Sequence, residues 1–396
     1  MSKWSHQLLL NLVIVIGSLF FGIAMVELSM YLAGLDYALV WQPDQRVGWR
    51  HVPGARKLWT EEGRGWVEIN KLGYRDHERT LEKHPGTFRI AVFGDSMTEA
   101  FQVNLDQTFT HLLEESLGKS GHRVEVLNFG VSGYSPIQEL LLFKQEGPRY
   151  HPDLVILAVF LDNDIRDSHP QLSASRSGPP FLAMNGEAVE FDFARTNQSV
   201  EDYQRQPFFW LRSHSGIYRL VSTWLWRRGE QARSEAVPRN TAPERYQVYQ
   251  KAIQAKWEQA WSFSQRALLE FAEEAKRQQT QFVLLSVPSP YVVNGGAWQS
   301  VIATYPSMMG ADWDPEGPEN RLRVFTREQH IPLIQPYKEF QEASKGPPIF
   351  WNNVGHFTPY GHQLMAKVLH DVLTGSRLLP DHNKESYAAS VFPEIK

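Results

Sequence analysis

The sequence of 396 residues contains no cysteine. This absence excludes thiolate chemistry and attachment to a membrane through a lipidated cysteine, and it is compatible with an oxidising compartment. The sequence also lacks an excess of basic residues, because 40 Lys and Arg stand against 44 Asp and Glu. Since the basic residues are dispersed along the chain, the positive surface of a nucleic-acid-binding protein is not expected.

Motifs for metals and cofactors are missing as well. The sequence has no HExxH motif, no other His, Asp or Glu cluster with the spacing of metal ligands, and no glycine-rich phosphate loop. We therefore expect no metal and no cofactor. Internal repeats and low-complexity tracts are also absent, and 42% hydrophobic with 21% charged residues is the composition of a folded globular protein.

One long apolar run lies near the N-terminus. Residues 8–35 are apolar except for Asn11, Glu27 and a few serines, and about 20 apolar residues span a bilayer. The run predicts a single transmembrane helix, with Glu27 toward its outer end, at the membrane interface or partnered within the membrane. Lys3 before the helix predicts that the rest of the chain is periplasmic or otherwise extracytoplasmic. A cleaved signal peptide is the alternative, although the hydrophobicity continues past Ala24.

The remainder of the chain alternates apolar strands with helical patterns. Apolar runs near 90–93, 124–129 and 154–160 each end in a polar loop, which is typical of parallel strands buried on both faces. The pattern predicts a doubly wound, flavodoxin-like α/β fold, interrupted by a cap where the alternation is lost. The expected segments are an anchor (1–35), a lead-in (36–85), the first core part (86–165), the inserted cap (166–245), the second core part (246–380) and a tail (381–396).

Three further segments have recognisable patterns. The lead-in has short strand candidates and turn signals, which predict a stalk or an edge hairpin. A long helix is expected over roughly 244–279. The aromatic residues of the cap favour packing in a core, while stacking on sugar rings and contact with a membrane interface are the alternatives. These aromatic residues are Trp210, Tyr218, Trp224 and Trp226.

Polar residues follow the three apolar runs. Ser96 in "GDS" stands at a tight turn before a helix, where it is either a nucleophile above a helix N-terminus or an N-cap. Gly133 in "NFGVSGYS" permits an exposed backbone N–H, and the amide of Asn163 in "LDND" is placed to bind an oxyanion. Ligands of doubly wound sheets bind at the carboxyl ends of the strands, so these residues predict one common site.

The blocks "GDSMTEA", "NFGVSGY", "LDND" and "GHFTPYGH" follow one another in the chain and resemble those of the SGNH (GDSL-type) hydrolase family. The segments "GWRHVPG", "INKLGYRD" and "HPDLVILAVFLDND" are similar to membrane-anchored bacterial members, so the resemblance covers most of 45–370. It implies that Ser96 is the nucleophile and His356 the general base. It also implies an oxyanion hole made by Ser96, Gly133 and Asn163. His362 is a competing base, although a helical position is expected for it.

The sequence departs from the family where an aspartate usually precedes the histidine. Asn353 and Val354 stand there instead. The first possibility is that Asn353, Asn352 or a backbone carbonyl orients the imidazole. The second is that Asp312 or Asp314 folds over the site, and the third is that activity has been lost and the crevice only binds.

Four other residues carry expectations. Ala100 replaces a glycine that is usual in the family, and we expect this change to affect only packing. Three acidic residues, Asp95, Asp162 and Asp164, are expected to accept hydrogen bonds within their loops.

The sequence thus predicts a membrane-anchored serine esterase of the SGNH type that faces outward. It would remove or transfer an acyl group, with acetyl favoured, on an envelope or extracellular polysaccharide. The alternatives are a lipid or short-chain esterase and a catalytically degenerate glycan-binding relative. The expected partners are the acylated substrate and the membrane, with no nucleic acid.

Overall fold

A five-stranded parallel sheet forms the centre of the fold. The computed structural model describes residues 3–32, 39–173, 178–185, 188–205, 209–235, 242–310, 312–353 and 355–380. The strands are β5 (Phe88–Gly94), β6 (Val124–Gly130), β7 (Leu154–Val159), β10 (Gln281–Ser286) and β11 (Leu333–Ile334). Their order, β11-β10-β7-β5-β6, is the flavodoxin-like order 2-1-3-4-5 when the core strands are counted along the chain. The predicted doubly wound α/β fold is confirmed.

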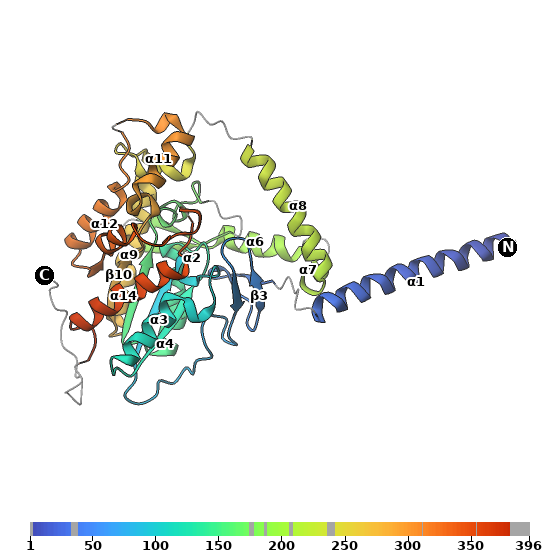
Figure 1. Ribbon diagram of the computed structural model, residues 1–396, viewed down its shortest axis with the longest axis horizontal. Coiled ribbons are helices and arrows are strands. Elements are labelled where there is room, and N and C mark those ends of the chain that lie inside the picture. Colours follow the sequence, from blue (N-terminus) through green and yellow to red (C-terminus); the bar gives the residue numbers. More distant parts are fainter. Residues whose placement is uncertain are drawn as a thin grey trace.

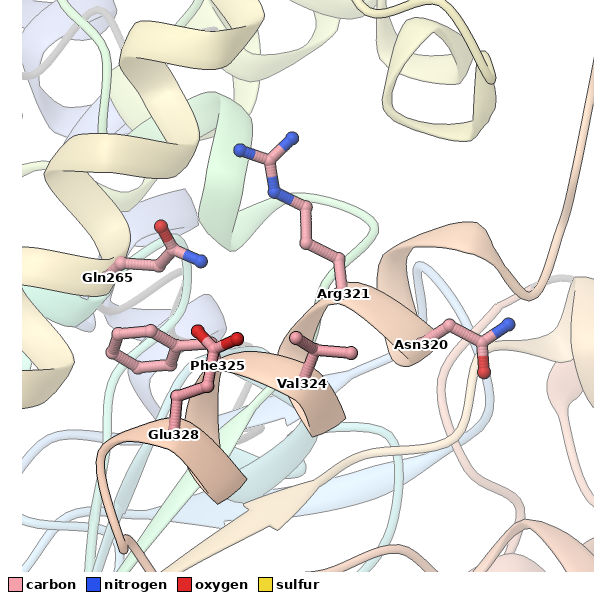
Figure 2. A pocket seen from close by; sticks show the side chains of 6 residues that line it. All are labelled: Gln265, Asn320, Arg321, Val324, Phe325 and Glu328. Carbon is pink, nitrogen blue, oxygen red and sulfur yellow. The ribbon is translucent and has the colours of Figure 1, made fainter.

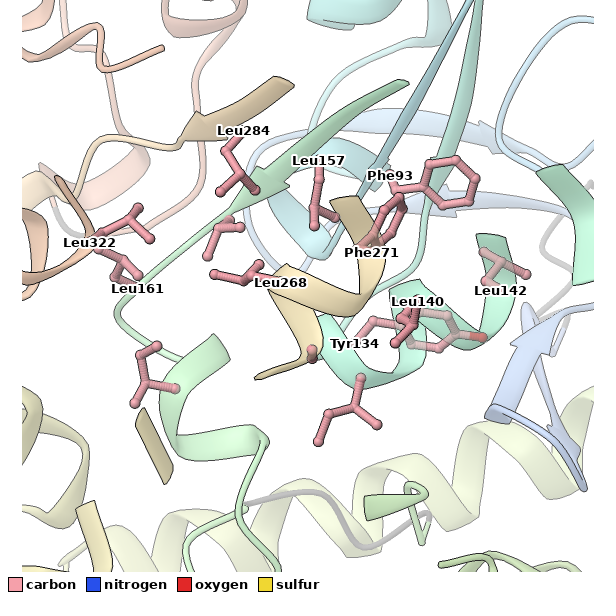
Figure 3. Packing of buried hydrophobic residues seen from close by; sticks show 14 of the residues in the cluster. Phe93, Tyr134, Leu140, Leu142, Leu157, Leu161, Leu268, Phe271, Leu284 and Leu322 are labelled. Carbon is pink, nitrogen blue, oxygen red and sulfur yellow. The ribbon is translucent and has the colours of Figure 1, made fainter. Parts of the chain in front are cut away.

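Helices cover both faces of this sheet. Because successive side chains of a strand point to opposite faces, Phe93 of β5 packs with α4 (Pro136–Tyr150) and α9 (Ala255–Arg277), while Val92 packs with α3 (Phe109–Lys119) and α14 (Pro359–Gly375). Figure 3 shows the first of these layers, in which Phe271 of α9 lies against Phe93 and Leu157. The two layers fix the loops at the carboxyl ends of β5, β6 and β7.

Shorter elements connect these layers. The predicted helix over 244–279 is wrong at its start, because the first residues form a separate 3-10 turn, η2 (Glu244–Tyr249), before α9 begins. Gln250, which lies between η2 and α9, forms an isolated β-bridge with Trp313. The shorter helices are α2 (Ser96–Glu99), α5 (Asp164–Asp167), α10 (Pro290–Val293), α11 (Gly295–Thr304), α12 (Gly317–Glu328) and α13 (Tyr337–Ala343). The 3-10 turns are η1 (Leu105–Gln107), η2 (Glu244–Tyr249), η3 (Pro306–Met308) and η4 (Trp351–Asn353).

The lead-in forms two antiparallel hairpins, β1 (Trp41–Asp44) with β2 (Gly48–His51), and β3 (Arg56–Trp59) with β4 (Gly65–Glu68). Val40, Val67 and Phe101 belong to a small core between the hairpins and the segment after α2. The buried guanidinium of Arg75 donates to the carbonyls of Glu99, Ala100, Val103 and Trp66. The hairpin interpretation is confirmed and the stalk interpretation is wrong, because this segment is packed into the body of the protein.

Among the described residues, the chain between α5 and η2 holds a hairpin, β8 (Phe181–Asn185) with β9 (Ala188–Asp192), and three helices. These are α6 (Ala194–Arg205), α7 (Phe209–His214) and α8 (Gly216–Glu235). Trp210 and Trp224 are 65% and 50% exposed. The prediction that this aromatic block packs in a core is therefore wrong for these two tryptophans, and the side chain of Trp226 lies outside the described residues.

The N-terminal helix α1 (Lys3–Leu32) projects away from the body of the protein (Figure 1). Among the described residues, one helix is long and apolar enough to cross a membrane, His6–Leu32, and none of its apolar segment is buried within the protein. Its length and composition suit a membrane span or a signal sequence. The expected tail, 381–396, lies outside the described residues.

Glu319 on α12 is a buried carboxylate that leads to a prediction about stability. It accepts hydrogen bonds from Ser286 Oγ at 2.8 and 2.9 Å and from Gln335 Nε2 at 3.0 Å, and burial raises its pKa to about 7. A raised pKa means that the folded state holds this proton more tightly than the unfolded state. The associated stabilisation is complete below pH 4.5 and is lost as the pH rises through 7, by about 3 kcal/mol.

We therefore expect Glu319→Gln to flatten the pH dependence of stability between pH 5 and 8. Urea unfolding of the detergent-solubilised chain, followed at several pH values, measures this slope. Glu328→Gln on the exposed side of the same helix is the control and should leave the slope unchanged. Equal slopes for the wild type and Glu319→Gln would contradict the prediction.

Candidate active site

Ser96 stands two residues after the end of β5, at the first position of α2. The N-cap of this helix is Asp95, whose Oδ1 accepts the N–H of Met97 at 2.9 Å. Ser96 is therefore not the N-cap that the sequence allowed, and its half-buried side chain has another partner. That partner is Nε2 of His356, which lies 2.8 Å from Ser96 Oγ.

His356 is held in a tight loop before α14. The loop is closed by a bridge between Phe350 and Phe357 and by a hydrogen bond of 2.9 Å from Trp351 N–H to the His356 carbonyl. The hydroxyl of Thr358 accepts the N–H of Gly361 and caps the helix that follows. The loop thus presents the imidazole to the carboxyl edge of the sheet, as the sequence predicted for a histidine placed before the last helix.

The other side of the imidazole contacts Glu62. Nδ1 of His356 is hydrogen-bonded to Oε2 of Glu62, and the backbone N–H of His356 donates to Oε1 at 3.2 Å. Glu62 lies between β3 and β4, 294 residues before the histidine that it contacts. One carboxylate therefore holds both the ring and the backbone of His356.

This contact corrects the expectations about the missing aspartate. The orientation of the ring by Asn352 or Asn353 is wrong, because Glu62 occupies the Nδ1 side of His356. The expectation for Asp312 or Asp314 is also wrong. Asp314 accepts the N–H of Glu316 within its own turn, and the exposed Asp312 pairs through its carbonyl with Lys251.

Two glycines allow Glu62 to approach. A Cβ at Gly355 would lie 1.6 Å from Glu62 Oε1, a separation that no side chain tolerates. Gly63, directly after the glutamate, has φ +65° and would place a Cβ 2.4 Å from the carbonyl of Gln102. Only glycine fits at both positions without moving the hairpin or the histidine loop.

The predicted oxyanion donors come from three loops. Gly133 has φ +75°, and the ring of Trp49 lies 3.4 Å from the position of its Cβ. Nδ2 of Asn163 donates to Asp95 Oδ2 at 3.1 Å, which leaves the second amide hydrogen for a ligand. Among the described residues, the backbone N–H groups of Ser96 and Gly133 have no acceptor.

A buried polar link ties the lead-in to the loop of Gly133. His51 Nε2 lies 2.6 Å from Glu99 Oε1, and Trp41 Nε1 donates to the same oxygen at 3.1 Å. Glu99 in turn accepts the N–H of Ser132 at 3.0 Å and the Ser132 hydroxyl. The lead-in therefore supplies Glu62 and also positions the loop that carries Gly133.

The three acidic residues of the polar loops accept hydrogen bonds. Asp164 accepts the N–H of Phe160 at 2.7 Å, and Asp162 accepts the hydroxyls of Tyr249 and Ser289. Asp95, which caps α2, and Asp164 are therefore confirmed as loop acceptors. The expectation is wrong for Asp162, whose partners Tyr249 and Ser289 stand 87 and 127 residues away in the chain.

Burial raises the pKa of Glu139 and of Asp164 well above the usual range. The neighbouring carboxyl of Asp95 raises both pKa values further, and Glu139 also raises that of Asp164.

His362 is excluded as the base. It is fully buried, its Nδ1 accepts the N–H of Phe109 at 3.3 Å, and burial lowers its pKa to about 3. Ala100, which ends α2, has φ +58° and thus adopts the left-handed conformation. The expectation that Ala100 matters only for packing is incomplete, because a side chain in this conformation costs roughly 1 kcal/mol that glycine would not.

Among the described residues, no group of three or more His, Cys, Asp or Glu side chains is arranged to hold a metal ion. A surface pocket lies beside α9 and α12 (Figure 2). It shares no residue with the Ser96 site and is lined by Gln265, Asn320, Arg321, Val324, Phe325 and Glu328.

Glu62 is the site residue that the sequence does not reveal. Its surroundings, "TEEGRGW", show only an acidic hairpin tip followed by glycine. The one available signal is that Gly355 stands directly before the histidine, which leaves room for a group from elsewhere. No spacing rule connects that room to Glu62.

No family model matches the chain. An arylesterase from Vibrio mimicus is 26% identical over 87 residues, which cover 22% of this chain and 44% of that protein. The chain therefore matches less than half the length of this relative.

Solved structures with a similar fold include esterases and lipolytic hydrolases. A lipolytic protein of the GDSL family from Desulfitobacterium hafniense aligns with a TM-score of 0.36 at 13% identity, over 72% of this chain and 99% of its own. The lipase/acylhydrolase from Enterococcus faecalis aligns with a TM-score of 0.37 at 13% identity, over 73% of this chain and 96% of its own. An acetyl-xylooligosaccharide esterase from Geobacillus aligns with a TM-score of 0.39 at 11% identity, over 74% of this chain and 97% of its own.

Proposed function

We propose that the protein is a serine ester hydrolase whose catalytic groups are Ser96 and His356, with Glu62 as the residue that positions the histidine. The observation that carries this proposal is the continuous series of hydrogen bonds from Ser96 Oγ through both nitrogens of His356 to the Glu62 carboxylate. A neutral hydroxyl needs an adjacent base to attack an ester, and the base needs a third group to fix its tautomer.

The reaction follows from these contacts. His356 Nε2 accepts the hydroxyl proton as Ser96 Oγ attacks the ester carbonyl, and Glu62 stabilises the imidazolium. The backbone N–H groups of Ser96 and Gly133 and the amide of Asn163 bind the tetrahedral oxyanion. The imidazolium then gives its proton to the leaving alcohol, and a water molecule activated by the same histidine releases the acyl group from Ser96.

The contact with Glu62 also weighs against the catalytically degenerate alternative. That alternative depended on the absence of an acid before His356. A carboxylate from the lead-in serves the same physical purpose, since it accepts a hydrogen bond from Nδ1–H and stabilises the cation that forms.

We further propose that α1 anchors the protein and that the site faces the extracytoplasmic side. The apolar surface of α1 and the cation Lys3 at its first position support this placement. The proposed substrate is an acyl ester, acetyl in the first instance, on an envelope or extracellular polysaccharide. Removal of the acyl group and its transfer to a second hydroxyl would use the same residues.

Labelling of the full-length chain in detergent with a fluorophosphonate tests the nucleophile. We expect covalent labelling that is lost in Ser96→Ala and strongly reduced in His356→Ala, while Ser116→Ala on α3 labels like the wild type. Hydrolysis of acetylated glycans, short-chain esters and long-chain esters by the same preparations then ranks the substrate classes. Absence of labelling in a folded wild-type chain would refute the esterase.

A further inference from the structure

Glu27 lies where the hydrocarbon layer would end. The segment from Leu8 to Glu27 has 20 residues. At 1.5 Å per residue it is about 30 Å long, which is the thickness of the bilayer core. With α1 in the membrane, the carboxylate of Glu27 therefore reaches the outer interface.

The carboxylate of Glu27 caps the first turn of α8. Oε2 accepts the N–H of Gly216 at 2.9 Å, Oε1 accepts the N–H of Ile217 at 3.1 Å, and the Ser215 hydroxyl also donates to Oε1. The first N–H groups of a helix have no partner within it, and an anion stabilises that end. A Cβ on Gly216 would lie 3.3 Å from Met30 Cε, so the two helices approach closely. These contacts place the start of α8 at the membrane surface.

The exposed side of α7 and α8 is apolar. Eight large apolar residues outside α1 are exposed in the described part of the chain, and five of them lie on these two helices: Trp210, Leu220, Val221, Trp224 and Leu225. The four residues of α8 fall on one side of the helix. They form two adjacent pairs, 220–221 and 224–225, and the pairs are four positions apart, which is about one helical turn. The guanidinium of Arg228 lies 4.0 Å from the centre of the Trp224 ring, so this side also carries a cation.

The direction of α8 suits contact with a bilayer. α8 crosses the direction of α1 steeply instead of running beside it (Figure 1). When α1 stands across the membrane, α8 extends close to the membrane surface on the side of the body. A helix in that position, with an apolar side and a basic residue, has the properties of an interfacial helix.

We propose that α7 and α8 bind the surface of the same bilayer that α1 crosses, through Trp210, Leu220, Val221, Trp224 and Leu225. Arg228 contacts anionic headgroups there. This inference rests on the proposed anchoring by α1 and is independent of the esterase chemistry. The protein then has two attachments to the membrane, joined by Glu27, and these restrict rotation of the body about α1.

The absence of cysteine makes a direct test possible, since a single introduced thiol carries the only probe. Val221→Cys and Leu225→Cys report on the apolar side of α8, and Ser222→Cys reports on its opposite side. Val324→Cys, an exposed apolar position on α12, controls for non-specific contact, and Val15→Cys reports on α1. Each full-length variant is labelled with a nitrobenzoxadiazole fluorophore and reconstituted into phosphatidylcholine and phosphatidylglycerol vesicles that contain nitroxide-labelled lipids.

We expect the lipid nitroxides to quench the probes at positions 221 and 225 at least threefold more than those at 222 and 324, with strong quenching at 15. Quenching at 15 alone would overturn the inference and leave the anchor in place. No quenching at 15 would overturn both the membrane contact of α7 and α8 and the anchoring by α1. Energy transfer between labelled copies at 221, without lipid quenching, would show that a second copy covers α8 and would also overturn it. Fluorophosphonate labelling of the same vesicles reports on Ser96 separately.

Discussion

Glu62→Gln is expected to lower kcat/KM for a short-chain ester by roughly 10³ to 10⁴, because an uncharged amide neither stabilises the imidazolium nor enforces the tautomer with Nδ1–H. The upper value is the known effect of the corresponding aspartate-to-asparagine change in a serine protease. KM should change little, since Glu62 contacts His356 and not the substrate. The expected loss therefore lies in kcat.

Rescue by a conservative variant, and the distribution of the loss between kcat and KM, would separate a positioning role from a purely structural one. Glu62→Asp should recover part of the rate, since it keeps the charge on a shorter side chain. Glu61→Gln, at the exposed neighbouring position, is the matched control. An unchanged kcat in Glu62→Gln would rule out this role.

Gly355→Ala is expected to lower kcat by at least 10²-fold while the chain still folds. The new methyl group would occupy the position of Glu62 Oε1, so the carboxylate must leave His356. Gly375→Ala at the end of α14 is the matched control, because nothing lies within 4 Å of its Cβ. Circular dichroism and steady-state kinetics on the three purified chains measure the effect.

The double variant tests whether both changes act through one contact. If Gly355→Ala acts by displacing Glu62, adding Glu62→Gln should cause little further loss, because residues that act as a unit are not additive. Losses that multiply in the double variant would instead mean that the methyl group added by Gly355→Ala disturbs His356 or Ser96 directly.

Much of the fold could be predicted because its determinants are local. Apolar runs that end in polar loops and alternate with helical patterns specify parallel strands covered on both faces, and β5, β6 and β7 occupy the expected positions. The same logic brought Ser96, Gly133 and Asn163 to one edge, since parallel strands end there together. The histidine before the last helix joined them as expected.

The aromatic residues of α7 and α8 show where local patterns fail. Tryptophan and leucine at helical spacing specify an amphipathic helix, but the same spacing serves a core and a membrane interface. The choice depends on what lies opposite the helix. In the structure Trp224 is 50% exposed, and Glu27 holds the start of the helix at the end of α1.

The sequence by itself determined the α/β architecture, the apolar N-terminal helix, and the serine and histidine at the carboxyl edge, because each depends on residues close together in the chain. Only the tertiary structure decided which acid completes the site. Glu62 and His356 are 294 residues apart, and their contact depends on a hairpin packed outside the central sheet and on a glycine that leaves space for a carboxylate. Such a contact is fixed by packing in three dimensions, and no periodicity in the chain encodes it.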